Sequence, residues 1–214
     1  MPSGATSNAK ARRAVWLKNL HQWHWISSSV CLLGMLIFSI TGITLNHSAQ
    51  IEAKPSVTRA RAEVPPALQA QLRQFAQGHD GAKAPLPTAA QAWLRAQWSL
   101  QSEGRIAEWS ADEVYLPLPK AGGDAWLRIA LDSGSAEYER TDRGWISWLN
   151  DLHKGRNTGV AWNWFIDILA AGCLMFCLTG LLILKLHAVN RPLTWPMVCL
   201  GILIPCALAL LFIH

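Results

Sequence analysis

Three long apolar runs constrain this chain more than any other feature. They cover residues 25–45, 164–184 and 193–213, and Asp167 is the only charged residue within them. Each run has about the 20 residues that a helix needs to cross the hydrocarbon core of a bilayer. A chain of 214 residues could not easily bury all three runs in a soluble core. The sequence therefore predicts an α-helical membrane protein with three transmembrane helices.

The basic residues beside these runs predict the orientation. Lys10, Arg12, Arg13 and Lys18 precede the first run, and Lys185 and Arg191 lie in the short loop after the second, with no acidic residue in either flank. Lys and Arg in short flanks favour the cytoplasmic side. The expected segments are a cytoplasmic basic leader (1–20), helix 1 (21–47), an outward domain (48–158), helix 2 (159–187), a cytoplasmic loop (188–192) and helix 3 (193–214). The net charge of +5 is then explained by attraction to membrane lipids, without nucleic acid.

The outward segment reads as a small α+β module. Apolar spacing predicts helices over 66–77 and 88–100, with Thr88 capping the second. Strands are expected over 113–118, 125–131 and 135–140, and Asp132-Ser133-Gly134 predicts a hairpin turn. No nucleophile with its base, phosphate loop or zinc quartet is recognisable in this segment, and His79 is expected to be a solvent-exposed loop residue.

A repeated histidine pattern points to function. W-L-x-x-L-H occurs at 16–21 and 148–153, F-x-x-T-G follows each copy at 38–42 and 176–180, and the two helices close with His47 and His187. Because helices 1 and 2 are expected to run antiparallel, His21 and His24 should meet His187 on the cytoplasmic side, and His47 should meet His153 on the outer side. Imidazoles from two helices are what a bis-axial haem iron requires.

The histidines can also be interpreted without haem. Each lies near the end of a run, where an imidazole can simply be solvated. Zinc would need four compact ligands, and the outer pair offers two His with Asp151 nearby. The absence of C-x-x-C-H excludes covalent c-type haem, so non-covalent haem b, one or two per protomer, fits best. The small residues Thr41, Gly42, Thr179 and Gly180 suit either a porphyrin edge or ordinary helix packing.

Distance limits how electrons could cross. His24 and His47 are 23 residues apart, roughly 35 Å on one helix. A carrier must relay the electron, a second subunit must supply it, or only one end holds haem. Two helices enclose a haem poorly, so a homodimer is favoured.

Two acidic residues are candidate catalytic groups. Asp167 lies one to two turns inside helix 2, where a buried carboxyl could relay protons or help to hold a cation. The alternative for Asp167 is to reach the interface or pair with Arg156. Asp151 lies near His153 among polar residues and is the second candidate.

Several segments of the chain resemble a known family. Residues 20–25, 41–47, 151–156 and 179–181, and the hairpin 126–138, are similar to those of PepSY-associated transmembrane proteins, here in a short three-helix form. The resemblance implies a bacterial inner-membrane protein with a periplasmic PepSY-like domain. It also implies a link to iron acquisition, through haem-containing reductases of ferric iron or ferric siderophores.

The sequence and the resemblance together predict a ferric reductase. His47 and His153 would hold the haem iron near the substrate, while His187 with His21 or His24 would form a cytoplasmic-side site or contact the electron donor. No G-x-G-x-x-G fingerprint is present, so the donor should be quinol or a separate cytoplasmic reductase. Two alternatives remain: a non-enzymatic membrane-anchored interaction module, and an electron-transfer subunit of a larger complex.

Overall fold

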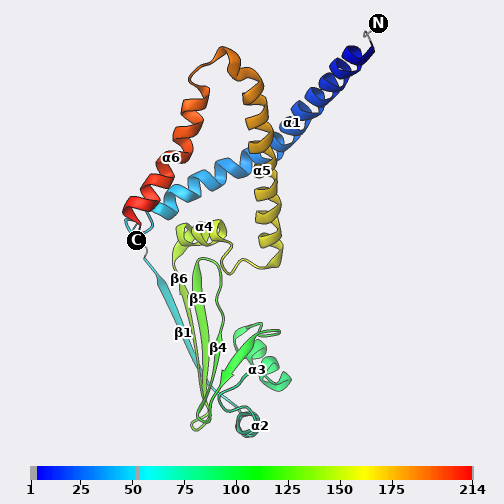
Figure 1. The fold of residues 1–214 in the computed structure, drawn as a ribbon. Coiled ribbons are helices and arrows are strands. Elements are labelled where there is room, and N and C mark those ends of the chain that lie inside the picture. The colour runs from blue at the N-terminus through cyan, green and yellow to red at the C-terminus, as the bar shows by residue number, and fades with distance from the viewer. Residues whose placement is uncertain (1–3, 52–53, 214) are drawn as a thin grey trace. The chain divides into compact units, whose positions relative to one another are not determined.

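The computed structural model describes residues 4–51 and 54–213. The chain divides into two units, Met1–Phe38 with Trp164–His214, and Ser39–Asn163. The first holds most of helix α1 (Gly4–Asn46) and nearly all of α5 (Val160–His187), followed by a 3-10 turn (Ala188–Asn190) and α6 (Thr194–Phe212). These helices are labelled in Figure 1.

Three helices have the length and apolar composition to cross a membrane: Lys10–Asn46 within α1, Val160–His187 and Thr194–Phe212. The prediction of three such helices is confirmed. A boundary between a leader and helix 1 was predicted at residues 20–21, but α1 runs through these residues without interruption from Gly4. Helix α6 contains Pro205, and none of its described residues is buried.

Small residues let α1 and α5 approach each other closely. A Cβ atom on Gly34 would lie 2.6 Å from Leu169, and one on Gly172 would lie 2.7 Å from the Cys31 sulfur. Cys31 is fully buried and Leu169 is 8% exposed. The two contacts run in opposite chain directions, so the helices are antiparallel, as predicted.

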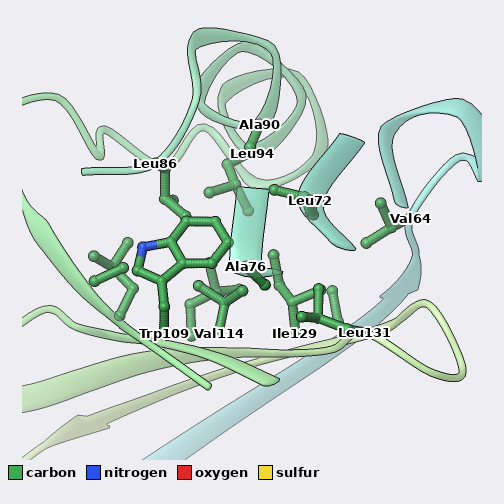
Figure 2. Packing of buried hydrophobic residues seen from close by; sticks show 14 of the residues in the cluster. Val64, Leu72, Ala76, Leu86, Ala90, Leu94, Trp109, Val114, Ile129 and Leu131 are labelled. Atoms are coloured by element: carbon green, nitrogen blue, oxygen red, sulfur yellow. The ribbon is translucent and has the colours of Figure 1, made fainter. Parts of the chain in front are cut away.

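The second unit contains a six-stranded antiparallel sheet with the order β1-β6-β5-β4-β3-β2. Its strands are β1 (Ser56–Glu63), β2 (Lys83–Pro85), β3 (Ile106–Trp109), β4 (Glu113–Pro117), β5 (Gly123–Ala130) and β6 (Ser135–Asp142). Helices α2 (Pro66–Gln77) and α3 (Thr88–Trp98) pack on it. Figure 2 shows Leu72 of α2 and Leu94 of α3 facing Trp109, Val114 and Ile129 of the strands.

The predicted α+β character of this region is confirmed, with corrections. Helix α2 and the β5–β6 hairpin lie where they were expected. Thr88 begins α3 but does not cap it, because Pro87 occupies the N-cap position and no side chain bonds there. His79 is half-buried rather than exposed: its ring stacks on Phe75 with centroids 4.0 Å apart.

Strands β1, β2 and β3 and helix α4 (Gly144–Lys154) were not predicted. Strand β1 is mostly exposed and polar, and it is held at the sheet edge by pairing with β6 and by ion pairs such as Arg59–Glu139 at 2.7 Å. Helix α4 contains the second W-L-x-x-L-H pattern. It ends at Gly155, whose φ of 67° is a left-handed conformation that glycine adopts without strain.

Candidate functional site

His24 of α1 lies against Thr179 and Gly180 of α5, and these two residues are called the His24 seat below. His24 Nδ1 lies 3.0 Å from the Thr179 hydroxyl oxygen. That hydroxyl donates its one hydrogen to the carbonyls of Met175 and Phe176, at 2.7 and 3.1 Å. The Thr179 oxygen must therefore accept from His24 Nδ1–H, so the neutral ring keeps its lone pair on Nε2. Any side chain on Gly180 would crowd the ring, because a Cβ atom would lie 3.2 Å from His24 Cε1.

His153 of α4 has a corresponding seat on the Thr-Gly pair of α1. Its Nδ1 lies 2.7 Å from the Thr41 hydroxyl oxygen, and a Cβ atom on Gly42 would lie 3.5 Å from its Cε1. One turn away on each helix, the Thr44 hydroxyl shares its hydrogen between Asn150 Oδ1 at 3.0 Å and the Thr41 carbonyl at 2.9 Å. The Thr-Gly pair after the second W-L-x-x-L-H pattern thus contacts His24, which lies just after the first pattern. The Thr-Gly pair after the first pattern contacts His153, which belongs to the second. The sequence did not predict this exchange of partners.

The rings of His21 and His187 lie close together at the C-terminal end of α5. The ring centroids are 6.5 Å apart and the ring planes are nearly perpendicular, at 86°. Each Nδ1 lies 2.8 Å from a backbone carbonyl of its own helix, that of Leu17 and that of Ile183. A carbonyl can only accept, so both rings carry a proton on Nδ1 and present the lone pair of Nε2. Of the two histidines expected to meet His187, the structure brings His21 to it.

His47 is anchored to its own helix in the same way. Its Nδ1 lies 3.0 Å from the Ile43 carbonyl and its side chain is exposed. His153 bonds to Thr41, which precedes His47 by six residues, or roughly 9 Å along the helix axis. The joint binding of haem iron by His47 and His153 stays a prediction.

The two candidate acids differ in their surroundings. Asp151 is 3% exposed, and both of its oxygens are occupied: Oδ1 lies 3.1 Å from Arg156 Nε, and Oδ2 accepts from the Gly122 amide at 2.9 Å. These contacts fasten α4 to the β4–β5 connection. Asp167 is exposed on α5. The expected alternative partner of Asp167, Arg156, pairs with Asp151. A catalytic role for either acid stays a prediction.

The described side chains form no compact metal site. Among the described residues, no group of three or more His, Cys, Asp or Glu side chains is arranged to hold a metal ion. An apolar groove of about 280 Å³ lies beside the His24 seat. It is lined by Trp16, Asn19, Leu20, Trp23, Met175 and Thr179.

Comparison with known families gives a match over nearly the whole chain. A family model described as "Putative PepSY_TM-like" matches residues 15–214. The match covers both histidine-bearing helices, the strand-rich region between them and the third apolar helix. Searches of curated proteins and of solved structures found no match to the chain.

Proposed function

The chain belongs to the PepSY_TM-like family, and from this premise we propose that it is a b-type haem protein that reduces ferric iron. In this proposal the protein lies in a bacterial inner membrane with its N-terminus in the cytoplasm. The strand-rich region faces the periplasm, where free or chelated Fe(III) is reduced to Fe(II) for uptake. The observation that carries the proposal is the pair of imidazoles, His21 and His187, on two antiparallel apolar helices.

The residues fit a haem in three respects. The ring centres of His21 and His187 are 6.5 Å apart, so the two imidazoles would be the residues that hold the haem iron. Their Nδ1 atoms are held by backbone carbonyls, so each Nε2 lone pair would be available to bind a metal ion. The groove beside His24, which neither His21 nor His187 lines, offers tryptophan and leucine side chains to an apolar ring. Bound haem b supplies reversible one-electron transfer.

The chain's own residues would orient and tune the ligands. Thr179 and Thr41 hold the rings of His24 and His153 in fixed orientations, so that neither imidazole rotates freely. His24 is then either a ligand itself or a packed neighbour of the His21–His187 pair. At the other end of α1, His47 presents Nε2 in the same manner and is proposed, with His153, as the ligand set nearer the ferric substrate. Asp167, exposed on α5, is the proposed proton carrier.

The electron route completes the proposal. Quinol or a separate cytoplasmic reductase is the donor, since the chain has no nucleotide-binding fingerprint. A homodimer would enclose haem more fully than the pair formed by α1 and α5 and would supply the second set of ligands. Membrane lipids surround α6, whose described residues are unburied within the chain. Reduction weakens the hold of hard oxygen ligands on the iron and so releases Fe(II).

The reaction is tested with protein purified in detergent from haem-replete cells. The protein is reduced anaerobically, freed of reductant and mixed with ferric citrate, and Fe(II) is followed with a colorimetric chelator while the haem spectrum is recorded. We expect one Fe(II) per haem oxidised. A haem that stays reduced in the presence of ferric citrate would contradict ferric reduction and favour an electron-transfer subunit. A colourless protein would favour the non-enzymatic interaction module.

A further inference from the structure

A cavity of about 250 Å³ lies in the strand-rich unit where α4 begins. One side is lined by Ser48, Ile51 and Lys54, and the other by Arg143, Trp145 and Ser147 at the start of α4. Asn150, which is 8% exposed, also lines it. The His153 seat lies one turn further along α4.

Two cations, Arg143 and Lys54, line the cavity. Neither Arg143 nor Lys54 forms an ion pair within the described ranges. Asp142, the acidic residue next to Arg143, accepts the Gly144 amide at 2.9 Å and lies 3.8 Å from both Lys120 and Arg140. Its charge is thus shared with other partners. Two cations with the hydroxyls of Ser48 and Ser147 are suited to the oxygens of a phosphate.

The cavity also lies where α1 leaves its apolar span. That span ends at Asn46, two residues before Ser48. Helix α4 is held against the last turns of α1 by the bonds Thr41–His153 and Thr44–Asn150. The cavity is therefore at the depth of the helix end, which for a spanning helix is the level of the lipid headgroups.

Helix α4 carries two exposed tryptophans, Trp145 (69% exposed) and Trp148 (46% exposed). Trp145 lines the cavity and lies on the side of α4 away from the buried Asn150 and Asp151. Trp148 lies nearer Asp151 and packs against Gly122, where an added Cβ atom would be 2.6 Å from its own. Exposed tryptophan on an amphipathic helix is typical of a helix that lies in the membrane interface.

We propose that this cavity binds the phosphate of an anionic phospholipid, with Arg143 and Lys54 holding the headgroup and Trp145 contacting the adjoining chains. A soluble anion would satisfy the two cations but would leave the exposed indoles without an apolar partner, whereas a lipid provides both. The site is independent of haem, and its occupancy can be measured on haem-loaded or haem-free protein alike.

The test uses full-length, delipidated protein in a neutral detergent. Binding of dioleoyl phosphatidylglycerol, dioleoyl phosphatidylcholine and inorganic phosphate is measured by native mass spectrometry. The Arg143→Gln/Lys54→Gln variant is compared with Arg59→Gln/Lys83→Gln, which makes the same charge change at ion-paired positions on the sheet. We expect phosphatidylglycerol to bind the cavity variant roughly 25-fold more weakly than the unmodified chain, or about fivefold for each cation. The control variant should bind like the unmodified chain.

A second charge change on α4 separates binding in the cavity from a general loss of positive charge near the membrane. Lys154→Gln, at the far end of that helix, should bind phosphatidylglycerol like the unmodified chain, because Lys154 does not line the cavity. Circular dichroism checks that all variants are folded. Equal binding of phosphatidylglycerol to the cavity and control variants would overturn the proposal, as would equal binding of phosphatidylglycerol and phosphatidylcholine. So would inorganic phosphate that binds as tightly as the lipid and depends on the same two cations, since it would indicate a soluble anion.

Discussion

His24 on α1 and Thr179 on α5 are joined by a 3.0 Å hydrogen bond whose direction is determined by the surrounding backbone. The threonine hydroxyl gives its hydrogen to its own helix and can therefore only accept from the imidazole. This bond fixes both the tautomer and the orientation of His24, and Gly180 leaves the space that the ring occupies. Thr41 and Gly42 give His153 a similar seat, so the two seats are the features most open to mutational test.

Replacement of Thr179 by Val removes the acceptor for His24 while keeping the side-chain volume. Interhelical hydrogen bonds in membrane proteins contribute about 0.6 kcal/mol on average, and we expect a loss of stability of about that size. Thr179→Ser keeps the hydroxyl and should retain the bond. Unfolding in mixed detergent micelles with increasing dodecyl sulfate measures both variants. Equal stability of Thr179→Val and the unmodified chain would show that the bond does not hold the helices together.

Gly172 tests the close packing of α1 and α5. A Cβ atom there would lie 2.7 Å from the Cys31 sulfur, and overpacking of this kind costs about 1–3 kcal/mol. Gly172→Ala should therefore destabilise the helix pair, and adding Cys31→Ala should recover part of the loss because it removes the sulfur. A double-mutant cycle measures this coupling.

Gly201 on α6 provides the matched control for Gly172. Nothing lies within 4 Å of a Cβ atom built at Gly201, so Gly201→Ala should have almost no effect on the same unfolding curve. Additive effects of Gly172→Ala and Cys31→Ala would contradict the contact between α1 and α5.

Asp151 should matter for the attachment of α4 to the sheet. Asp151→Ala leaves the buried Gly122 amide without its acceptor, which costs about 1–3 kcal/mol. Asp151→Asn keeps an acceptor and loses only the attraction to Arg156, so its effect should be smaller. Thermal unfolding in detergent ranks the two variants. As a surface control, Lys154→Gln on the exposed side of α4 should shift stability by at most about 0.5 kcal/mol. Equal thermal stability of Asp151→Ala, Asp151→Asn and the unmodified chain would contradict this structural role.

Asp142 should make stability depend on pH in the acidic range. The hydrogen bond from the Gly144 amide, with lesser help from Lys120 and Arg140, lowers the pKa of Asp142 below its ordinary value of 3.8. A lowered folded-state pKa means that the stabilisation is complete above the unfolded value and is lost as the pH falls through the folded one. Asp142→Asn should show a flatter decline in thermal stability between about pH 5 and about pH 2. Parallel declines for the two proteins would contradict this account.

Much of the fold could be predicted because its signals are local. The three apolar helices follow from hydropathy, α2 from apolar spacing, and the β5–β6 turn from Asp132-Ser133-Gly134. Strand β1 could not be predicted in this way, because its sequence S-V-T-R-A-R-A-E has few apolar residues and forms a strand only through cross-strand partners such as Glu139. Helix α4 was missed because its pattern was interpreted as the approach to α5.

The contacts of the candidate histidines were predictable only in part, and their roles stay predictions. The antiparallel arrangement and the depth of the residues predicted that His187 lies near His21, but depth could not show that His24 contacts Thr179 instead. The partner of His153 depends on rotation of α4 about its axis, which the bonds of Asn150 and Asp151 to other elements determine. No sequence period encodes such contacts. The two Thr-Gly pairs could be recognised from the sequence, because F-x-x-T-G occurs once after each histidine pattern.

The most direct measurement of the central claim is the absorption spectrum of the purified protein before and after dithionite, compared with three histidine variants. His21→Ala and His187→Ala each remove one ring of the proposed ligand pair. His79→Ala is the matched control, because His79 has the same Nδ1-to-carbonyl bond, at 2.9 Å from Phe75, but belongs to the strand-rich region. The account predicts sharp reduced bands of six-coordinate haem b in the unmodified chain and in His79→Ala, and their loss or marked weakening in the other two variants. A colourless unmodified protein, or bands that are as strong in His21→Ala and His187→Ala as in the unmodified chain, would contradict it.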